Sequence, residues 1–223
     1  MSKTINISTI LLIVIVPVTV LLLSFNLTFR FPATYSFYFT DTQAVSKLGF
    51  EIEDSEVTHE IAAYLSNPKD NTFQVYEKTG NYKDRVFGIE DQRAMRSAKK
   101  FLFWEGIAGL SALALSLGVF FGTSRKAADD RDLYQFVMRG FGIGSVLLLA
   151  ASDILALIPA VRKGFYRWIF GVKLSKNSAL HSLITAGFPK TYCIMSTVIG
   201  VVLLLLFIFL FYRRYRPRGR IFY

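Results

Sequence analysis

The chain has 223 residues, of which 52% are hydrophobic and 15% aromatic, and its 26 Lys and Arg against 16 Asp and Glu give a formal net charge of +10. This apolar content excludes a disordered chain, and the single cysteine excludes an internal disulfide framework. The apolar residues are gathered in runs that are too long for a soluble core, and basic residues cluster beside them. We therefore expect a polytopic membrane protein whose positive charges face lipid headgroups, with no nucleic-acid partner.

Four stretches are long and apolar enough to cross a bilayer, which takes about 20 residues at a rise of about 1.5 Å per residue. They are residues 5–25, 101–121, 140–159 and 191–212. Because a backbone in lipid must satisfy its own hydrogen bonds, each stretch is expected to be a helix. The first stretch is not followed by a small-x-small cleavage pattern, so we interpret it as an uncleaved signal-anchor. The predicted fold class is an all-α membrane protein, a four-helix transmembrane bundle.

The distribution of basic residues predicts the orientation of the chain. The C-terminal tail, residues 213–223, carries five arginines and no acidic residue. The positive-inside rule places such a tail in the cytoplasm, and four spans then place the N-terminus there too. Residues 26–100 and 160–190 are consequently expected outside the cytoplasmic membrane, and the whole chain is expected to form a single integral membrane domain.

Local patterns in residues 26–100 predict a small mixed α/β extracytoplasmic domain. A capping pattern at Thr40–Gln43 predicts the start of a first helix, which Gly49 closes. Apolar residues at helical spacing predict a second helix that ends before Asn67. Two short strands around a Gly-containing turn follow, and then a polar helix that continues into the second span. The last three elements are expected at residues 57–65, at residues 72–76 paired with 85–87, and at residues 89–100.

The second outer segment, residues 160–190, has basic and aromatic residues and no acidic residue. Such a segment is typical of chain that lies at the headgroup level, with its rings in the interface and its cations on lipid phosphates. The residues predicted to bind lipid headgroups are Arg162, Lys163, Arg167 and Lys173.

Three local patterns, taken with this order of parts, carry a family resemblance. They are a Tyr64-Leu65 pair that ends the second outer helix, the run from Glu90 to Met95 that leads into the second span, and Leu183-Ile184 followed by Phe188-Pro189 before the fourth span. Over nearly its whole length the chain resembles a family of four-span bacterial membrane proteins that includes the lipoprotein intramolecular transacylases, known as Lit.

The resemblance implies a reaction and also a departure from it. Active members transfer an acyl chain from the diacylglyceryl group of a lipoprotein to the amine of its N-terminal cysteine, using two outer-face histidines. In an alignment by eye, the positions of those histidines hold Ala94 and Tyr166. Alanine does not titrate and tyrosine keeps its proton to about pH 10, so neither replaces imidazole as a base. We expect a divergent relative that interacts with membrane lipid or diacylglyceryl lipoprotein at the outer face without transacylase activity.

Two alternatives stay open at this stage. One is a membrane acyltransferase that uses a different base, for which Asp153, Glu105 and His181 are the candidates; the other is a membrane-anchored accessory or binding protein. A carboxylate at the centre of a spanning helix costs about 2.5 to 3.5 kcal/mol, so Asp153 should face the bundle interior and have a partner. The partner is either a counter-charge in a polar pocket shared with Glu105, from Lys99, Lys100 or Arg162, or a serine or backbone group on a facing helix.

The remaining motifs concern packing and cofactors. Two Gly-x-x-x-Gly pairs, Gly118 with Gly122 and Gly140 with Gly144, are expected to serve close helix packing within the chain. The sequence shows neither a metal-ligand spacing nor a Gly-rich phosphate loop, so no metal and no cofactor are expected.

Overall fold

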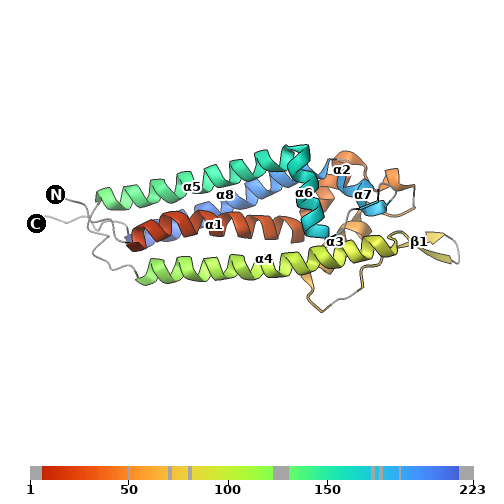
Figure 1. The fold of residues 1–223 in the computed structure, drawn as a ribbon, viewed down its shortest axis with the longest axis horizontal. Helices are drawn as coiled ribbons and strands as arrows, with labels where there is room; N and C mark the ends of the chain where they lie inside the picture. Colours follow the sequence, from red (N-terminus) through yellow and green to blue (C-terminus); the bar gives the residue numbers. More distant parts are fainter. Residues whose placement is uncertain are drawn as a thin grey trace, which may run out of the picture. The chain divides into compact units, whose positions relative to one another are not determined.

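The computed structural model describes residues 7–49, 51–69, 72–79, 82–122, 131–171, 174–175, 178–185 and 187–215. The described chain is almost entirely helical (Figure 1). Its elements are α1 (Ile7–Arg30), α2 (Pro32–Thr42), the 3₁₀-helix η1 (Ser46–Leu48), α3 (Asp54–Ser66), β1 (Tyr76–Thr79), β2 (Tyr82–Arg85), α4 (Ile89–Gly122), α5 (Arg131–Leu157), α6 (Pro159–Phe170), α7 (Ala179–Thr185) and α8 (Phe188–Tyr215).

Four of these helices are long and apolar enough to cross a membrane, as the sequence predicts. They contain the segments Thr9–Arg30, Ile89–Gly122, Gln135–Leu157 and Phe188–Arg213. The polar helix before the second predicted span is also confirmed, because α4 runs without a break through 34 residues. At about 1.5 Å per residue α4 is roughly 51 Å long, whereas a hydrocarbon core is about 30 Å thick. The helix α4 is therefore longer than a single span requires.

Prolines divide the helices at two places. Phe31 and Ile158 precede Pro32 and Pro159, and both have extended backbone conformations, with ψ of 117° in each case. A proline disfavours helical backbone in the residue before it, but it is well suited to the first turn of a new helix. For this reason α2 and α6 begin as separate helices directly after α1 and α5, and the third span ends at Leu157 rather than at Pro159.

The short helices of residues 26–100 agree with the predictions in part. The capping pattern at Thr40–Gln43 does not begin a helix: α2 ends at Thr42, and Gln43 caps it with a left-handed φ of 50°. The physical reason is that α2 had already started at Pro32, so these polar residues meet its C-terminus. Gly49 does close the following turn η1, with a φ of 78°. The predicted second helix is confirmed as α3, whose apolar stripe is buried and which ends before Asn67.

The predicted hairpin exists but is shifted toward its turn. Strands β1 and β2 are antiparallel and pair Tyr76 with Arg85 and Thr79 with Tyr82. The apolar residues on either side of this pairing, Phe73 and Phe87, are each 1% exposed and belong to the core. These two residues were expected to lie in the strands, but their rings are buried in the core and the strand pairing does not include them.

The described chain falls into two compact units. Unit 1 comprises Met1–Ser24, Gly106–Ala151 and Thr197–Tyr223, and unit 2 comprises Phe25–Glu105 and Ser152–Ser196. Each of the four long helices contributes a segment to both units. Among the described residues, the buried hydrophobic cluster of unit 1 has nine members and that of unit 2 has 25.

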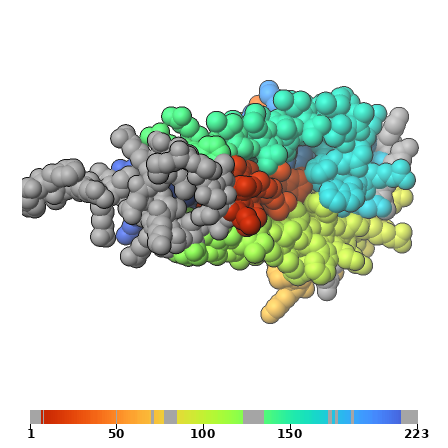
Figure 2. Space-filling view, turned by 60° about the vertical axis from the view of Figure 1, so that its left-hand side comes forward, coloured from red at the N-terminus to blue at the C-terminus, as the bar shows by residue number. Residues whose placement is uncertain are grey.

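Close approach at glycines shapes unit 1, where α1 lies between α4 and α5 (Figures 1 and 2). A Cβ atom at Gly140 or Gly144 of α5 would lie only 2.9 Å from Ile13 or Pro17 of α1. The prediction of packing within the chain is thus confirmed for this glycine pair. It is not confirmed for Gly118 and Gly122 of α4, because no described atom lies within 4 Å of a Cβ placed there.

Candidate functional site

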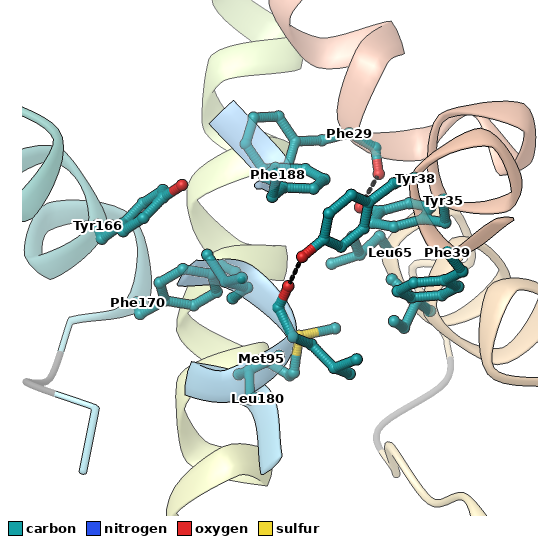
Figure 3. A pocket seen from close by; sticks show the side chains of 14 residues that line it. Phe29, Tyr35, Tyr38, Phe39, Leu65, Met95, Tyr166, Phe170, Leu180 and Phe188 are labelled. Atoms are coloured by element: carbon teal, nitrogen blue, oxygen red, sulfur yellow. Dashed lines mark hydrogen bonds between the residues drawn. The ribbon is translucent and has the colours of Figure 1, made fainter. Parts of the chain in front are cut away.

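A cavity of about 40 Å³ lies inside unit 2, and seven helices contribute to its wall. Its lining is almost wholly apolar or aromatic (Figure 3). The residues are Phe29 of α1, Tyr35, Tyr38 and Phe39 of α2, Ile61 and Leu65 of α3, Met95 and Ala98 of α4, Tyr166 and Phe170 of α6, Leu180, Leu183 and Ile184 of α7, and Phe188 of α8. The break at Pro32 turns α2 back so that its aromatic residues face this cavity.

Two of the three tyrosines in the wall are fixed by hydrogen bonds to backbone carbonyls. The Tyr35 hydroxyl donates to the carbonyl of Phe29 at 2.7 Å, and the Tyr38 hydroxyl donates to the carbonyl of Leu183 (Figure 3). Burial raises the pKa of Tyr35, Tyr38 and Tyr166 above the ordinary value for a phenol. All three rings therefore remain neutral, and the cavity presents no charge from its own wall.

Of the two positions at which the family resemblance implies histidines, one lines this cavity. Tyr166 belongs to its wall, whereas Ala94 is fully buried and does not line it but precedes the lining residue Met95 in α4. In Figure 3 the Tyr166 ring stands at one side with its hydroxyl turned toward the other labelled rings. Among the described residues that hydroxyl has no hydrogen-bond partner. The wall thus contains no titrating base, but it does contain one unengaged hydroxyl.

The helix that carries Tyr166 is amphipathic. Arg162, Tyr166 and Phe170 follow one another at a spacing of four residues and are all half-buried or buried, whereas Lys163 and Arg167 are exposed. Trp168 is 66% exposed and touches the Phe101 ring edge-to-face, with ring centroids 4.5 Å apart. The predicted headgroup residues are therefore divided between the two faces of α6. Lys173 lies outside the described residues.

Glu105 has partners that the sequence reasoning missed. Asn26 of α1 donates from Nδ2 to Glu105 Oε2 at 2.5 Å and to the carbonyl of Leu102 at 2.7 Å, and Arg30 Nη2 donates to the same carbonyl at 3.2 Å. The counter-charge near Glu105 is Arg30, rather than the expected Lys99, Lys100 or Arg162. The four-residue spacing of Asn26 and Arg30 near the end of the first span was the available signal, since it places both on one helix face.

Asp153 has a serine on a facing helix as its hydrogen-bond partner. Ser196 of α8 donates from Oγ to Asp153 Oδ1 at 3.0 Å, and Cys193 Sγ lies 3.6 Å from the Asp153 carbonyl. This corresponds to the serine partner on a facing helix, one of the two possibilities left open. The hydrogen bonds described for Asp153 and Glu105 go to different residues, and neither carboxylate lines the cavity.

His181 lies on α7 near the cavity but does not line it. Its backbone N–H donates to Ser178 Oγ at 3.0 Å, an N-terminal helix cap. Across the residues that the structure describes, there is also no group of three or more His, Cys, Asp and Glu side chains that could hold a metal ion. None of the three candidate bases, Asp153, Glu105 and His181, is among the residues that line the cavity.

A second, more open hollow of about 590 Å³ lies in unit 2 beside the start of α4. Its most buried polar residue is Asp91, which is 2% exposed and accepts a hydrogen bond from the N–H of Gly88 at 3.2 Å. A carboxylate at the third position of a helix that binds back to the preceding N–H is a capping arrangement. Asp91 thus stabilises the start of α4.

Comparisons of the chain with known protein families, with curated proteins and with solved structures find no match. The class of the protein is accordingly defined by the fold and the cavity alone. It is a predominantly helical protein with four helices able to span a membrane and an aromatic cavity in one of its two units.

Proposed function

We propose that this protein binds the acyl chain of a membrane lipid or of a diacylglyceryl lipoprotein at the outer face of the cytoplasmic membrane, without transacylase activity. The observation that carries the proposal is the aromatic cavity of unit 2. The hydroxyls of Tyr35 and Tyr38 are already bonded to the backbone, so most of the wall offers a ligand only apolar contact. An acyl chain is the apolar group that a membrane supplies in quantity.

The proposal includes the orientation of the chain in the membrane. Both termini lie in the cytoplasm, because the basic tail of residues 213–223 follows the fourth span. Unit 2, with its short helices and the β1–β2 hairpin, is then the extracytoplasmic part. Lys163 and Arg167 on the exposed face of α6, together with Lys173, bind lipid phosphates, and the exposed ring of Trp168 lies at the headgroup level.

The absence of a base in the cavity wall supports binding rather than catalysis. Acyl transfer to an amine needs a group that takes a proton near the working pH. The relevant positions hold Ala94 and Tyr166, and burial raises the pKa of Tyr166 further. This is the pattern expected of a divergent relative of the Lit family that keeps the four-span architecture and not the reaction.

The two alternatives explain less of the structure. An acyltransferase with another base would use Glu105, Asp153 or His181, but none of these lines the cavity. A pure membrane anchor would leave the cavity, with its convergent tyrosines, without a role. The lipid-binding proposal accounts for both the cavity and the cationic helix beside it.

Native mass spectrometry of the full-length protein in mild detergent tests the proposal, with a diacylglyceryl-cysteine lipopeptide and phosphatidylglycerol as probes. Ala98→Leu adds three carbon atoms at the cavity wall and should weaken probe binding by about tenfold. Ala160→Leu, on the exposed face of α6, is the matched control and should bind as the unmodified protein does. Thermal unfolding reports whether both variants are folded. Equal probe binding by two folded variants would contradict the proposal.

A further inference from the structure

The two tryptophans of the chain both belong to unit 2, and both are exposed. Trp104 of α4 is 60% exposed and Trp168 of α6 is 66% exposed, although tryptophan is highly buried on average. The Trp168 ring touches Phe101 of α4 with ring centroids 4.5 Å apart, and Trp104 follows Phe101 by three residues on nearly the same face. Phe103, 46% exposed, touches Trp104 with centroids 5.6 Å apart. We call these four residues the aromatic corner.

Two exposed cations on α6 adjoin the aromatic corner. Lys163 and Arg167 are one turn apart, and Arg167 directly precedes Trp168. The segments that form the corner supply no acidic residue, since residues 92–104 and 154–190 contain no Asp or Glu. In Figure 1 the helix α6 runs across the direction of α4. A helix that presents exposed rings and cations without acids is complementary to a layer of anionic headgroups.

The charge pattern of α4 changes at the same place. The helix carries six charged residues up to Lys100, and beyond that position it has one, Glu105. From Trp104 to Phe121, which is 59% exposed, the helix rises roughly 26 Å, close to the hydrocarbon thickness of about 30 Å. Exposed aromatic rings at both ends of a span of this length are typical of the two membrane interfaces.

We propose that the aromatic corner, together with Lys163 and Arg167, docks on anionic phospholipid headgroups and fixes the depth of the protein in the membrane. The cations bind the headgroups, and the rings of Trp104 and Trp168 lie at the level of the glycerol backbone. Two cations without acidic neighbours favour a lipid with net negative charge over a zwitterionic one. The inference rests on the proposed function, which places α6 against lipid. It adds the charge class of that lipid and the part of α4 that completes the surface.

Tryptophan fluorescence tests the depth without an added label, because both tryptophans lie in the corner. The full-length protein is placed in nanodiscs whose lipids carry a spin label either near the glycerol backbone or near the end of the acyl chain. The shallow label should quench at least about twofold more strongly than the deep label. Trp104→Phe and Trp168→Phe leave one reporter each and should show the same order. Stronger quenching by the deep label, or no quenching by either, would overturn the proposal.

The lipid preference is tested by quenching with brominated phosphatidylglycerol against brominated phosphatidylcholine at equal content. Phosphatidylglycerol should quench about twofold more strongly, because it gathers at the two cations. Lys163→Gln with Arg167→Gln should abolish this excess. The matched control, Arg93→Gln with Arg96→Gln, removes the same charge from exposed positions near the start of α4 and should keep the excess. Equal quenching of the unmodified protein by both lipids, or an equal loss in the control, would overturn the assignment.

The outcomes separate this inference from the binding of an acyl chain in the cavity. Ala98→Leu changes the cavity wall and should leave both quenching patterns as they are. The expected quenching in a protein whose cavity binds no probe would contradict the acyl-chain proposal and support the docking surface. Probe binding that is lost in Ala98→Leu, together with deep or absent quenching, would contradict the docking surface and support the cavity.

Discussion

The two units of this protein bury very different amounts of side chain, although the same four long helices run through both. The described core of unit 2 has 25 buried hydrophobic residues, and that of unit 1 has nine. Unit 1 instead brings its helices together at glycines, as at Gly144 against Pro17, and through a hydrogen bond of 3.0 Å between Thr19 and Ser116.

The difference is the one expected if, as proposed, unit 1 lies in lipid and unit 2 lies in water. Helices in lipid gain little from hiding apolar side chains from one another, because the solvent is equally apolar, so close backbone approach and dispersion hold them together. Burial of aromatic rings, by contrast, is favourable where water is the alternative. A cavity wall of rings is therefore a feature that unit 2 can maintain, and the comparison predicts different consequences for substitutions in the two units.

The largest effect is expected in the aromatic core of unit 2. Phe73 is 1% exposed and lies between the rings of Tyr64 and Phe87, with centroid distances of 5.3 and 4.7 Å. Phe73→Ala should lower the free energy of unfolding by about 3 to 5 kcal/mol, because it removes the ring and leaves a void. Chemical unfolding in detergent measures this. Phe37→Ala, at a 50% exposed position, should change little; similar losses in both would count against a distinct core in unit 2.

The second largest effect is expected for a glycine substitution in unit 1, and a glycine elsewhere in the same unit provides the control. Gly144→Leu would place Cβ 2.9 Å from the rigid ring of Pro17, so α1 and α5 would have to separate. We expect a loss of about 1 to 3 kcal/mol in the free energy of unfolding. The same change at Gly118 meets no described atom within 4 Å and should be close to neutral. A destabilised Gly118→Leu variant, assayed alongside by thermal unfolding, would show that the two glycine pairs are equivalent.

A third prediction concerns the polar contact within unit 2. Asn26→Leu leaves the Glu105 carboxylate without its hydrogen-bond donor and should cost about 1 to 3 kcal/mol. Replacing both residues, Asn26→Leu with Glu105→Leu, removes the unpaired carboxylate but leaves Arg30 without its counter-charge, so only part of that loss should be recovered. Unfolding curves of the single and double variants form a cycle. Additive losses in the double variant would mean that the two residues are not coupled.

The smallest effect is expected for the hydrogen bond of unit 1. Thr19→Val removes one partner of the bond to Ser116. Side-chain hydrogen bonds between membrane helices contribute about 0.6 kcal/mol on average, so the change should be of that order. The control is Thr19→Val in a Ser116→Ala background, where almost no further loss is expected. A loss above about 2 kcal/mol would indicate that polar contacts dominate unit 1.

How far the sequence predicts this structure depends on the range of the interactions involved. The four spans, the stripe of α3 and the continuous α4 follow from local hydropathy and periodicity, and they were predicted. The end of α2 was misread because the cap pattern at Thr40–Gln43 is compatible with either end of a helix. Only the earlier proline at position 32 distinguishes the two.

The site depended on contacts between distant residues, which no local pattern specifies. Asn26 and Glu105 are 79 positions apart, and Ser196 and Asp153 are 43 apart. The need of Asp153 for a partner could be predicted from its cost in a span, but the choice of Ser196 could not. The cavity likewise arises only where seven helices converge. Ala94 and Tyr166 were singled out by family resemblance, and the structure adds that Tyr166 lines the cavity and that Ala94 is buried next to the lining residue Met95.

The most direct test of the central claim, lipid binding without transacylation, is mass spectrometry of a reporter lipoprotein's N-terminal peptide. The reporter is expressed with and without this protein in a host that lacks other N-acylating enzymes. With Ala94 and Tyr166 in place of the histidines, the account predicts that the diacylglyceryl form is unchanged. Appearance of the N-acylated lyso form would contradict it and would show that another group serves as the base.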